Sequence, residues 1–283
     1  MKSFPRTEVA GISLPRIIIG SNWMLGFSHT SVSADAMIKS KFSKKEAVAG
    51  VLEAYLQYDI NAIMAPFYGN DVLVDGIHLA EERTGKKIIM IDTPIIDVHD
   101  SAESRNSASR IIESGKRAGS DFCLIHHSCA EQLVNKLNGR IERISDYLEM
   151  IRDNEMIPGL SAHMPEIIQF SDENEYDVQT YIQLYNPIGF LMQIEVEGVS
   201  RIIWNAKKPV MAIKSMAAGR VSPYVGISFA FSTLRSCDMV TIGAHTPEEV
   251  HEDVEIAFAA LERRIPNLEG RSSPNKTKLL GGD

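Results

Sequence analysis

Two adjacent histidines, His126 and His127, end an apolar run in the segment DFCLIHHSCAEQ (residues 121–132). Imidazole titrates near neutral pH, so such a pair can transfer protons or bind a metal ion. The apolar run is typical of a buried strand, and neighbouring strand residues point to opposite faces. We therefore expect His126 to face a site and His127 to pack behind it as support.

Other polar groups follow apolar runs in the same way, among them Asp92, His163 and Lys214. A carboxylate with two imidazoles suits a divalent metal that keeps positions open for water or substrate, so Asp92, His126 and His163 are the candidate metal ligands. Lys214 is a candidate electrostatic stabiliser. It could also form a Schiff base if its pKa were lowered, whereas an ion pair with Asp92 would act in the opposite direction.

Eight short apolar runs alternate with longer segments of helical period, which is the pattern of strands covered by helices. Eight such units in about 250 residues match a (β/α)8 barrel, while a doubly wound open sheet would use fewer. The sequence thus predicts the α/β class, with a single (β/α)8 TIM barrel over residues 1–268 and a C-terminal tail at 269–283. The expected strands are 16–20, 61–65, 87–92, 122–126, 157–161, 181–185, 209–213 and 239–243.

Active sites of such barrels form at the C-terminal ends of the strands and in the loops that follow. The loop after the first strand, SNWMLGFSHTSVSADAMIKSKF, is long and rich in aromatic residues, as lids and binding loops often are. We expect Trp23, Phe27 and His29 to fold over the mouth and exclude water; the alternative is that they plug the barrel as core. The expected substrate-binding residues are Asn22, Trp23, His29, Tyr185 and Asn186.

The segment AAGRVSP is a candidate anion site near the end of the chain. Gly219 gives a flexible loop, Arg220 supplies a charge, and Ser222 with Pro223 is a helix-start signal whose amides can face an oxyanion. Glu248 and Glu249 open the next helix and would repel a phosphate placed there, and a surface ion pair is the simpler role for Arg220.

Composition narrows the partners of the chain. Its 283 residues carry a net charge of −8, which opposes binding to nucleic acid or to an anionic membrane surface. The N-terminus MKSFPRTEVAG lacks the apolar core of a signal peptide, no run of about eighteen apolar residues occurs, and the three cysteines show no metal-binding spacing. We expect a cytoplasmic protein with a small-molecule substrate, with homo-oligomer formation left open.

The chain resembles the aldo-keto reductase superfamily. Its second half resembles the fifth to eighth strand segments of bacterial members, in the segments GLSAHMPEII, LYNP, IKSMAAGR and IGAHTPEEV. Its first half resembles the segments with the catalytic aspartate, tyrosine and histidine, in INAIMAPFYG and SDFCLIHH. The resemblance implies a barrel that reduces carbonyls with NADP(H). It also implies cofactor contacts around Gly219, Arg220, Ser222 and Gly243.

The catalytic tetrad of that family is incomplete here. Tyr68 and His126 match its tyrosine and histidine, but Ile63 stands at the aspartate position and Pro94 at the lysine position. Without the lysine and aspartate, a phenol with a pKa near 10 is a poor acid at neutral pH.

The expected function is therefore a non-redox acid–base or metal-assisted conversion of a carbonyl or hydroxyl, sugar-like substrate. The expected catalytic group comprises His126, Asp92, His163, Lys214 and Tyr68. Two alternatives stay open, an NADP(H)-dependent carbonyl reductase and a non-catalytic ligand-binding barrel. The cofactor is correspondingly either a divalent metal or NADP(H).

Overall fold

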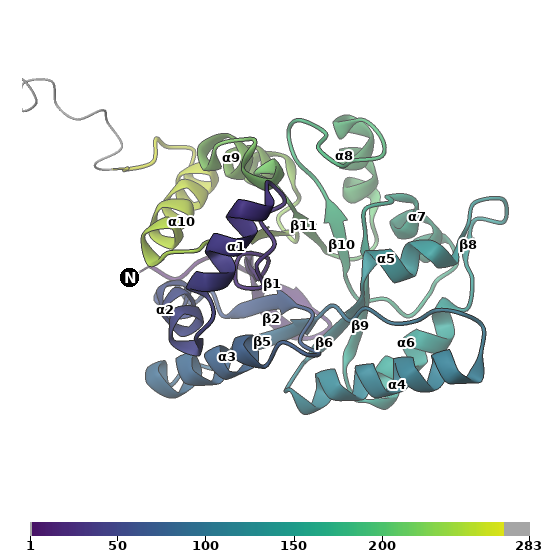
Figure 1. The fold of residues 1–283 in the computed structure, drawn as a ribbon. Coiled ribbons are helices and arrows are strands. Elements are labelled where there is room, and N and C mark those ends of the chain that lie inside the picture. The colour runs from purple at the N-terminus through teal and green to yellow at the C-terminus, as the bar shows by residue number, and fades with distance from the viewer. Residues whose placement is uncertain (1, 269–283) are drawn as a thin grey trace, which may run out of the picture.

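Eight parallel strands close into a barrel in the computed structural model, which describes residues 2–268 (Figure 1). Each predicted apolar run overlaps one of these strands, with β9 extending one residue further, so the predicted (β/α)8 barrel is confirmed. The predicted tail at 269–283 lies outside the described residues. The strands are β3 (Ile17–Gly20), β4 (Ala62–Ala65), β5 (Ile89–Asp92), β6 (Phe122–Ile125), β9 (Ile157–Ala162), β10 (Tyr181–Leu184), β11 (Val210–Ile213) and β12 (Met239–Ile242).

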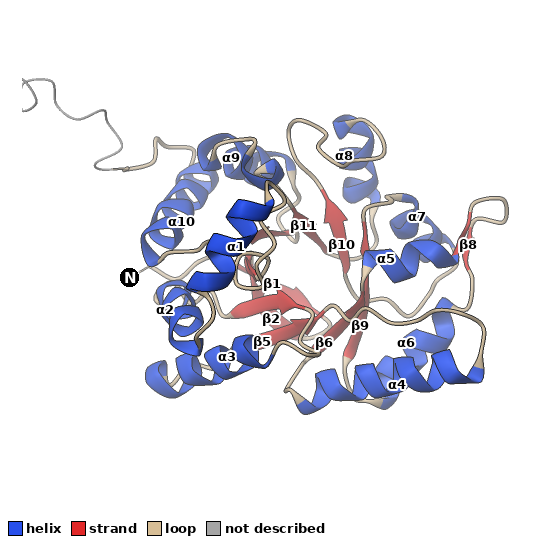
Figure 2. Ribbon diagram, viewed as in Figure 1, coloured by secondary structure: helices blue, strands red, loops and turns tan. Residues whose placement is uncertain are grey.

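Helices surround the strands on the outside of the barrel (Figure 2). Strand residues that point outward, such as Ile19, Ile63 and Val240, pack with the helices in one large apolar cluster. None of the described helices is long and apolar enough to cross a membrane. The helices are α1 (Val32–Lys41), α2 (Lys45–Leu56), α3 (Asp71–Thr84), α4 (Ala102–Arg117), α5 (His127–Ala130), α6 (Ile144–Asp153), α7 (Glu166–Glu173), α8 (Val196–Asn205), α9 (Pro223–Thr233) and α10 (Pro247–Glu262).

The interior of the barrel is a second apolar cluster, which includes Ile18, Phe122 and Met211. Val9 and Leu14 join this cluster from a hairpin, β1 (Arg6–Val9) and β2 (Ile12–Pro15), that the sequence analysis did not identify. Both side chains are almost completely buried. The hairpin lies before the first barrel strand, so it closes the N-terminal end and leaves the C-terminal end for a cavity.

The connection between β6 and β9 carries extra structure. It contains α5, the 3₁₀ turn η1 (Glu131–Leu133) and a short hairpin of β7 (Val134–Asn135) and β8 (Arg140–Ile141). The Glu131 carboxylate accepts hydrogen bonds from the backbone N–H groups of His163 (2.5 Å) and Met164 (2.8 Å). Glu131 thus fixes the backbone that carries His163 at the end of β9.

Close packing of α9 against the β11 loop gives a first prediction. A Cβ atom on Gly226 would lie 2.6 Å from the carbonyl oxygen of Ser215, whereas one on Gly50 in α2 would meet no atom within 4 Å. Gly226→Ala is expected to destabilise the fold by about 1–3 kcal/mol through overpacking, and Gly50→Ala to stabilise it by up to about 1 kcal/mol through helix propensity. Chemical denaturation checks both; equal midpoints for the two variants would contradict the described packing.

Candidate active site

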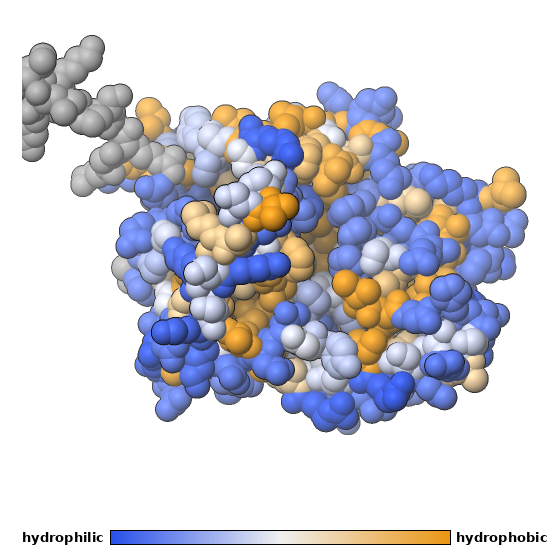
Figure 3. Space-filling model, viewed as in Figure 1, coloured by the Kyte–Doolittle hydropathy of each residue, from blue (hydrophilic) through white to orange (hydrophobic). Residues whose placement is uncertain are grey.

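A cavity of about 700 Å³ opens at the C-terminal ends of the strands. Residues from all eight barrel strands or from the loops after them line it, so it occupies the expected end of the barrel. Figure 3 shows this part of the molecule hollowed beside α1, with hydrophobic residues at depth. The volume suits a small or medium-sized ligand.

Three imidazoles meet on one wall of the cavity. The rings of His127 and His163 stack with centroids 3.8 Å apart, and those of His126 and His127 lie 4.2 Å apart. All three residues line the cavity, so the prediction that His127 packs behind His126 as support is wrong. The reason is local: α5 begins at His127, and the alternation of a strand no longer applies there.

The hydrogen bonds of His126 define its tautomer. The backbone N–H of Ser128 donates to His126 Nδ1 at 3.3 Å, and Ser128 Oγ lies 2.8 Å from the same atom. A backbone N–H can only donate, so Nδ1 of the neutral ring is the acceptor and Nε2 carries the hydrogen. Burial, and then the proximity of His127 and Lys214, lower the pKa of His126 to about 4. At neutral pH His126 is therefore an uncharged donor.

The other two imidazoles are uncharged for similar reasons. Burial, and next His127 and Lys214, lower the pKa of His163 to about 3. Burial also lowers the pKa of His127, but the Glu131 carboxylate acts in the opposite direction. Of this stacked pair, His127 is the imidazole whose cation is supported by a carboxylate, which makes it the better proton acceptor.

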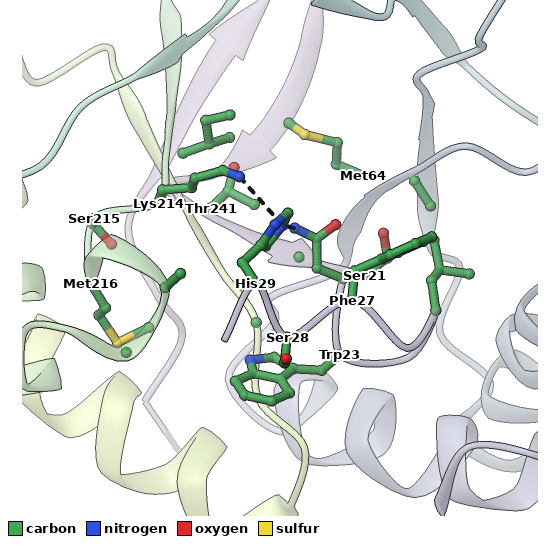
Figure 4. A pocket seen from close by; sticks show the side chains of 18 of the residues that line it. Ser21, Trp23, Phe27, Ser28, His29, Met64, Lys214, Ser215, Met216 and Thr241 are labelled. Carbon is green, nitrogen blue, oxygen red and sulfur yellow. Dashed lines mark hydrogen bonds between the residues drawn. The ribbon is translucent and has the colours of Figure 1, made fainter. Parts of the chain in front are cut away.

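Lys214 reaches into the cavity from the end of β11. Its Nζ donates to His29 Nε2 at 3.3 Å, and Asn22 Nδ2 donates to the same nitrogen at 3.1 Å (Figure 4). Because both partners are donors, His29 is neutral and accepts through Nε2. Burial lowers the pKa of Lys214, and burial followed by Lys214 lowers that of His29.

The loop after β3 lines the cavity as the sequence predicts. Trp23, Phe27 and His29 are all part of its wall, and the Trp23 ring stacks on His245 with centroids 4.8 Å apart. Phe27 is 51% exposed, so it is not a core plug. The Glu249 carboxylate lies 2.6 Å from His245 Nδ1 and accepts a hydrogen bond from the His245 backbone N–H at 3.0 Å. The role of Trp23, Phe27 and His29 in excluding water stays a prediction.

Asp92 does not reach the cavity, and this corrects the sequence analysis. Ile89 and Ile91 of β5 belong to the barrel interior, so Asp92 points outward to the helices. One carboxylate oxygen accepts from the Phe67 N–H at 3.2 Å, and the other packs against Gly115 of α4 without a hydrogen-bond partner among the described residues. Burial raises the pKa of Asp92 to about 7.

The predicted metal site is therefore wrong, because one of its three ligands lies behind the barrel wall. Within residues 2–268, no group of three or more His, Cys, Asp or Glu side chains is placed to hold a metal ion. The predicted internal ion pair of Asp92 with Lys214 does not form either, since Lys214 lines the cavity and Asp92 does not.

Three further predicted residues lie outside the cavity wall. Tyr68 is 63% exposed in the loop after β4. Tyr185 is buried in the outer apolar cluster, where its hydroxyl donates to Thr233 at 3.0 Å, and Asn186 is buried with its amide bonded to the backbone of Phe190. The roles predicted for these side chains in binding or catalysis are not supported by their positions.

The predicted anion segment is only partly at the cavity. Gly219, Ser222 and Gly243 line it, and Ser222 caps α9 through the Val225 N–H. Arg220 is instead exposed, with its guanidinium 4.0 Å from the centre of the Phe190 ring. Three carboxylates, those of Glu249, Glu252 and Asp253, also line the cavity.

A closed barrel of eight parallel strands with a cavity at this end belongs to the (β/α)8 class, whose sites lie at the C-terminal face. No protein-family model matches the sequence. No curated protein matches it either.

Solved structures, by contrast, share the fold. A protein of Pseudomonas aeruginosa assigned to the aldo-keto reductases has a TM-score of 0.64 at 17% identity, covering 92% of this chain and 97% of its own. An aldo-keto reductase from Bacillus halodurans gives 0.60 at 10% identity over 96% and 99% of the two chains. One from Klebsiella pneumoniae, solved with NADP and acetate, gives 0.55 at 15% identity over 100% and 97%. At these identities the likeness establishes an aldo-keto-reductase-like barrel fold.

Proposed function

We propose that this chain is a diverged member of the aldo-keto reductase superfamily and a cytoplasmic enzyme. In this proposal it catalyses a non-redox acid–base conversion of a small carbonyl or hydroxycarbonyl compound. The observation that carries the proposal is the cavity itself, in which the Lys214 amine faces uncharged imidazoles. Burial is the cause of its lowered pKa, with no carboxylate contributing. The protonated Lys214 amine, in a partly buried site without a carboxylate partner among the described residues, is suited to stabilise a substrate oxygen that gains negative charge during the reaction.

The reaction assigned to these groups is proton transfer next to a carbonyl. The substrate oxygen accepts hydrogen bonds from Lys214 Nζ and His126 Nε2–H, which stabilise the enolate as it forms. The His127 imidazole takes the proton from the neighbouring carbon and returns it at the other position or to a different face. Binding of a polar substrate beside His127 raises the low pKa of that imidazole and so favours this step.

The reductase alternative has one supporting observation, the NADP-bound structure with the same fold. The residues of this chain do not fit the reductase tetrad. Ile63, at the aspartate position, points away from the barrel interior and packs in the apolar layer between strands and helices. Tyr68 is exposed, and Pro94, at the lysine position, has no amine. The carboxylates of Glu249, Glu252 and Asp253 also line the cavity, and their negative charge opposes the 2′-phosphate of NADP(H). The metal-assisted route is not retained, because the metal site does not form.

Proton exchange in D2O tests the proposal. Pyruvate, dihydroxyacetone and glycolaldehyde are incubated with the protein, and exchange at the carbon next to the carbonyl is followed by 1H NMR, beside fluorescence titrations with NADH and NADPH. Exchange that does not need a nucleotide supports the acid–base enzyme. Carbonyl reduction with NADPH would establish the reductase, and binding of a probe without exchange or reduction would point to a ligand-binding barrel.

A further inference from the structure

We propose that Lys214 forms a covalent imine with its carbonyl substrate, an inference that rests on the proposed function and assigns a nucleophile to it. In this form of the reaction the imine nitrogen takes the place of the substrate oxygen, so proton transfer gives an enamine instead of an enolate. The geometry that points to this is an amine in the cavity that has no carboxylate partner among the described residues, lies on a left-handed backbone and is hydrogen-bonded to His29. The substrate class is then restricted to aldehydes and ketones.

The backbone at Lys214 determines where its amine points. Ile213 faces the barrel interior, so continued alternation would send Lys214 outward into the helix layer. Lys214 instead has φ 57°, in the left-handed region that non-glycine residues rarely adopt. Backbone strain of this kind is concentrated at functional sites. Here it directs the Lys214 side chain into the cavity instead of into the helix layer.

The surroundings of the amine allow it to lose its proton. Desolvation lowers the pKa of Lys214, and no carboxylate restores it. His126, His127 and His163 line the same cavity as Lys214, and no ion pair joins Lys214 to a carboxylate among the described residues. A lysine desolvated in this way is an activated nucleophile.

His29 is the proton acceptor for the amine. Its Nε2 already accepts a hydrogen bond from Lys214 Nζ at 3.3 Å, and Asn22 holds the ring by a second bond to the same atom. Transfer along the first bond leaves a neutral amine and a His29 imidazolium. Burial lowers the pKa of both groups, but His29 is the more exposed of the two, so its cation lies nearer to water than a charged Lys214 would.

The step balances without an oxidant or reductant. The neutral Nζ adds to the carbonyl carbon, a proton moves from nitrogen to oxygen, and the resulting hydroxyl leaves as water with the proton that His29 had taken. The product is a protonated imine, so the net change is loss of one water.

Reductive trapping tests the inference. The whole protein is incubated with pyruvate or dihydroxyacetone and sodium cyanoborohydride at pH 7, and adducts are located by intact mass and peptide mapping. The expected adduct adds the mass of the probe less one oxygen atom, on Lys214. It forms at least tenfold faster there than on Lys87, whose side chain is 88% exposed. His29→Gln should slow labelling of Lys214 at least tenfold without changing labelling of Lys87. Equal labelling of both lysines would overturn the inference.

The variant Lys214→Arg separates this inference from the proposed function. Arginine keeps a cation but forms no imine, so the variant should lose the D2O exchange activity of the natural protein. Retained exchange in Lys214→Arg would overturn the imine and leave the acid–base proposal intact. Absence of exchange in the natural protein, with labelling confined to Lys214, would instead refute the proposed conversion while supporting the imine. Circular dichroism confirms that each variant is folded.

Discussion

The Asp92→Asn variant is expected to be more stable than the natural protein at pH 8, and no longer to lose stability as the pH rises from 4 to 7. Burial raises the pKa of Asp92 from its usual value near 3.8 to about 7. A raised carboxyl pKa means that the folded state holds a proton that the unfolded state has already released. Stability therefore falls between pH 4 and pH 7, by about 4 kcal/mol in total, and is flat above.

Asparagine keeps the shape of the carboxyl but cannot ionise. Its amide still leaves one polar atom unpaired against Gly115, which costs about 1–3 kcal/mol, so a net gain of a few kcal/mol at pH 8 is expected. Urea denaturation from pH 4 to pH 8 measures the effect, with exposed Asp75→Asn as the matched control. Parallel pH profiles for the natural protein and Asp92→Asn would show that Asp92 is not the buried acid described.

Lys214→Met should reduce the D2O exchange rate by about 10²–10³-fold. Methionine is of similar length and apolar, so the variant keeps the packing and removes the donor that faces the developing oxygen charge. The free energy of unfolding is expected to stay the same or to rise slightly, because a desolvated amine with no carboxylate partner is removed.

The matched control for this variant is Lys87→Met, which changes a side chain that is 88% exposed and away from the cavity. It should leave the exchange rate unchanged. An exchange rate in Lys214→Met within threefold of the natural rate would remove Lys214 from the site and with it both proposals.

The fold could be predicted from sequence because parallel barrel strands are buried on both faces and appear as continuous apolar runs. Each of the eight runs overlaps a strand. The β1–β2 hairpin was missed because its strands alternate between buried and exposed residues and give no such run. The small elements between β6 and β9 are too short to give a periodic signal.

The direction of a site side chain could be predicted from sequence where the chain keeps strand geometry beyond the end of the strand. Where the backbone leaves that geometry, the direction could not be predicted. His163 lies inward as the alternation of β9 requires. The same alternation along β5 places Asp92 outward, because Ile89 and Ile91 point into the barrel interior. His127 could not be found this way because a helix starts there, and Lys214 reaches the cavity only because its backbone leaves the strand conformation. Tyr68 lies in a loop, where residue spacing does not determine side-chain direction.

Small carbonyl compounds are proposed to bind in the cavity beside Lys214. Met64 and Met216 line that cavity, whereas Met37 of α1 is 61% exposed and not part of its wall. We would titrate protein labelled with 13C at the methionine methyl groups with pyruvate and follow the methyl signals, assigned with Met→Leu variants. We expect saturable shifts at Met64 and Met216, none at Met37, and loss of both shifts in Lys214→Met. No shift at Met64 and Met216, or the same shifts in Lys214→Met, would refute binding beside Lys214.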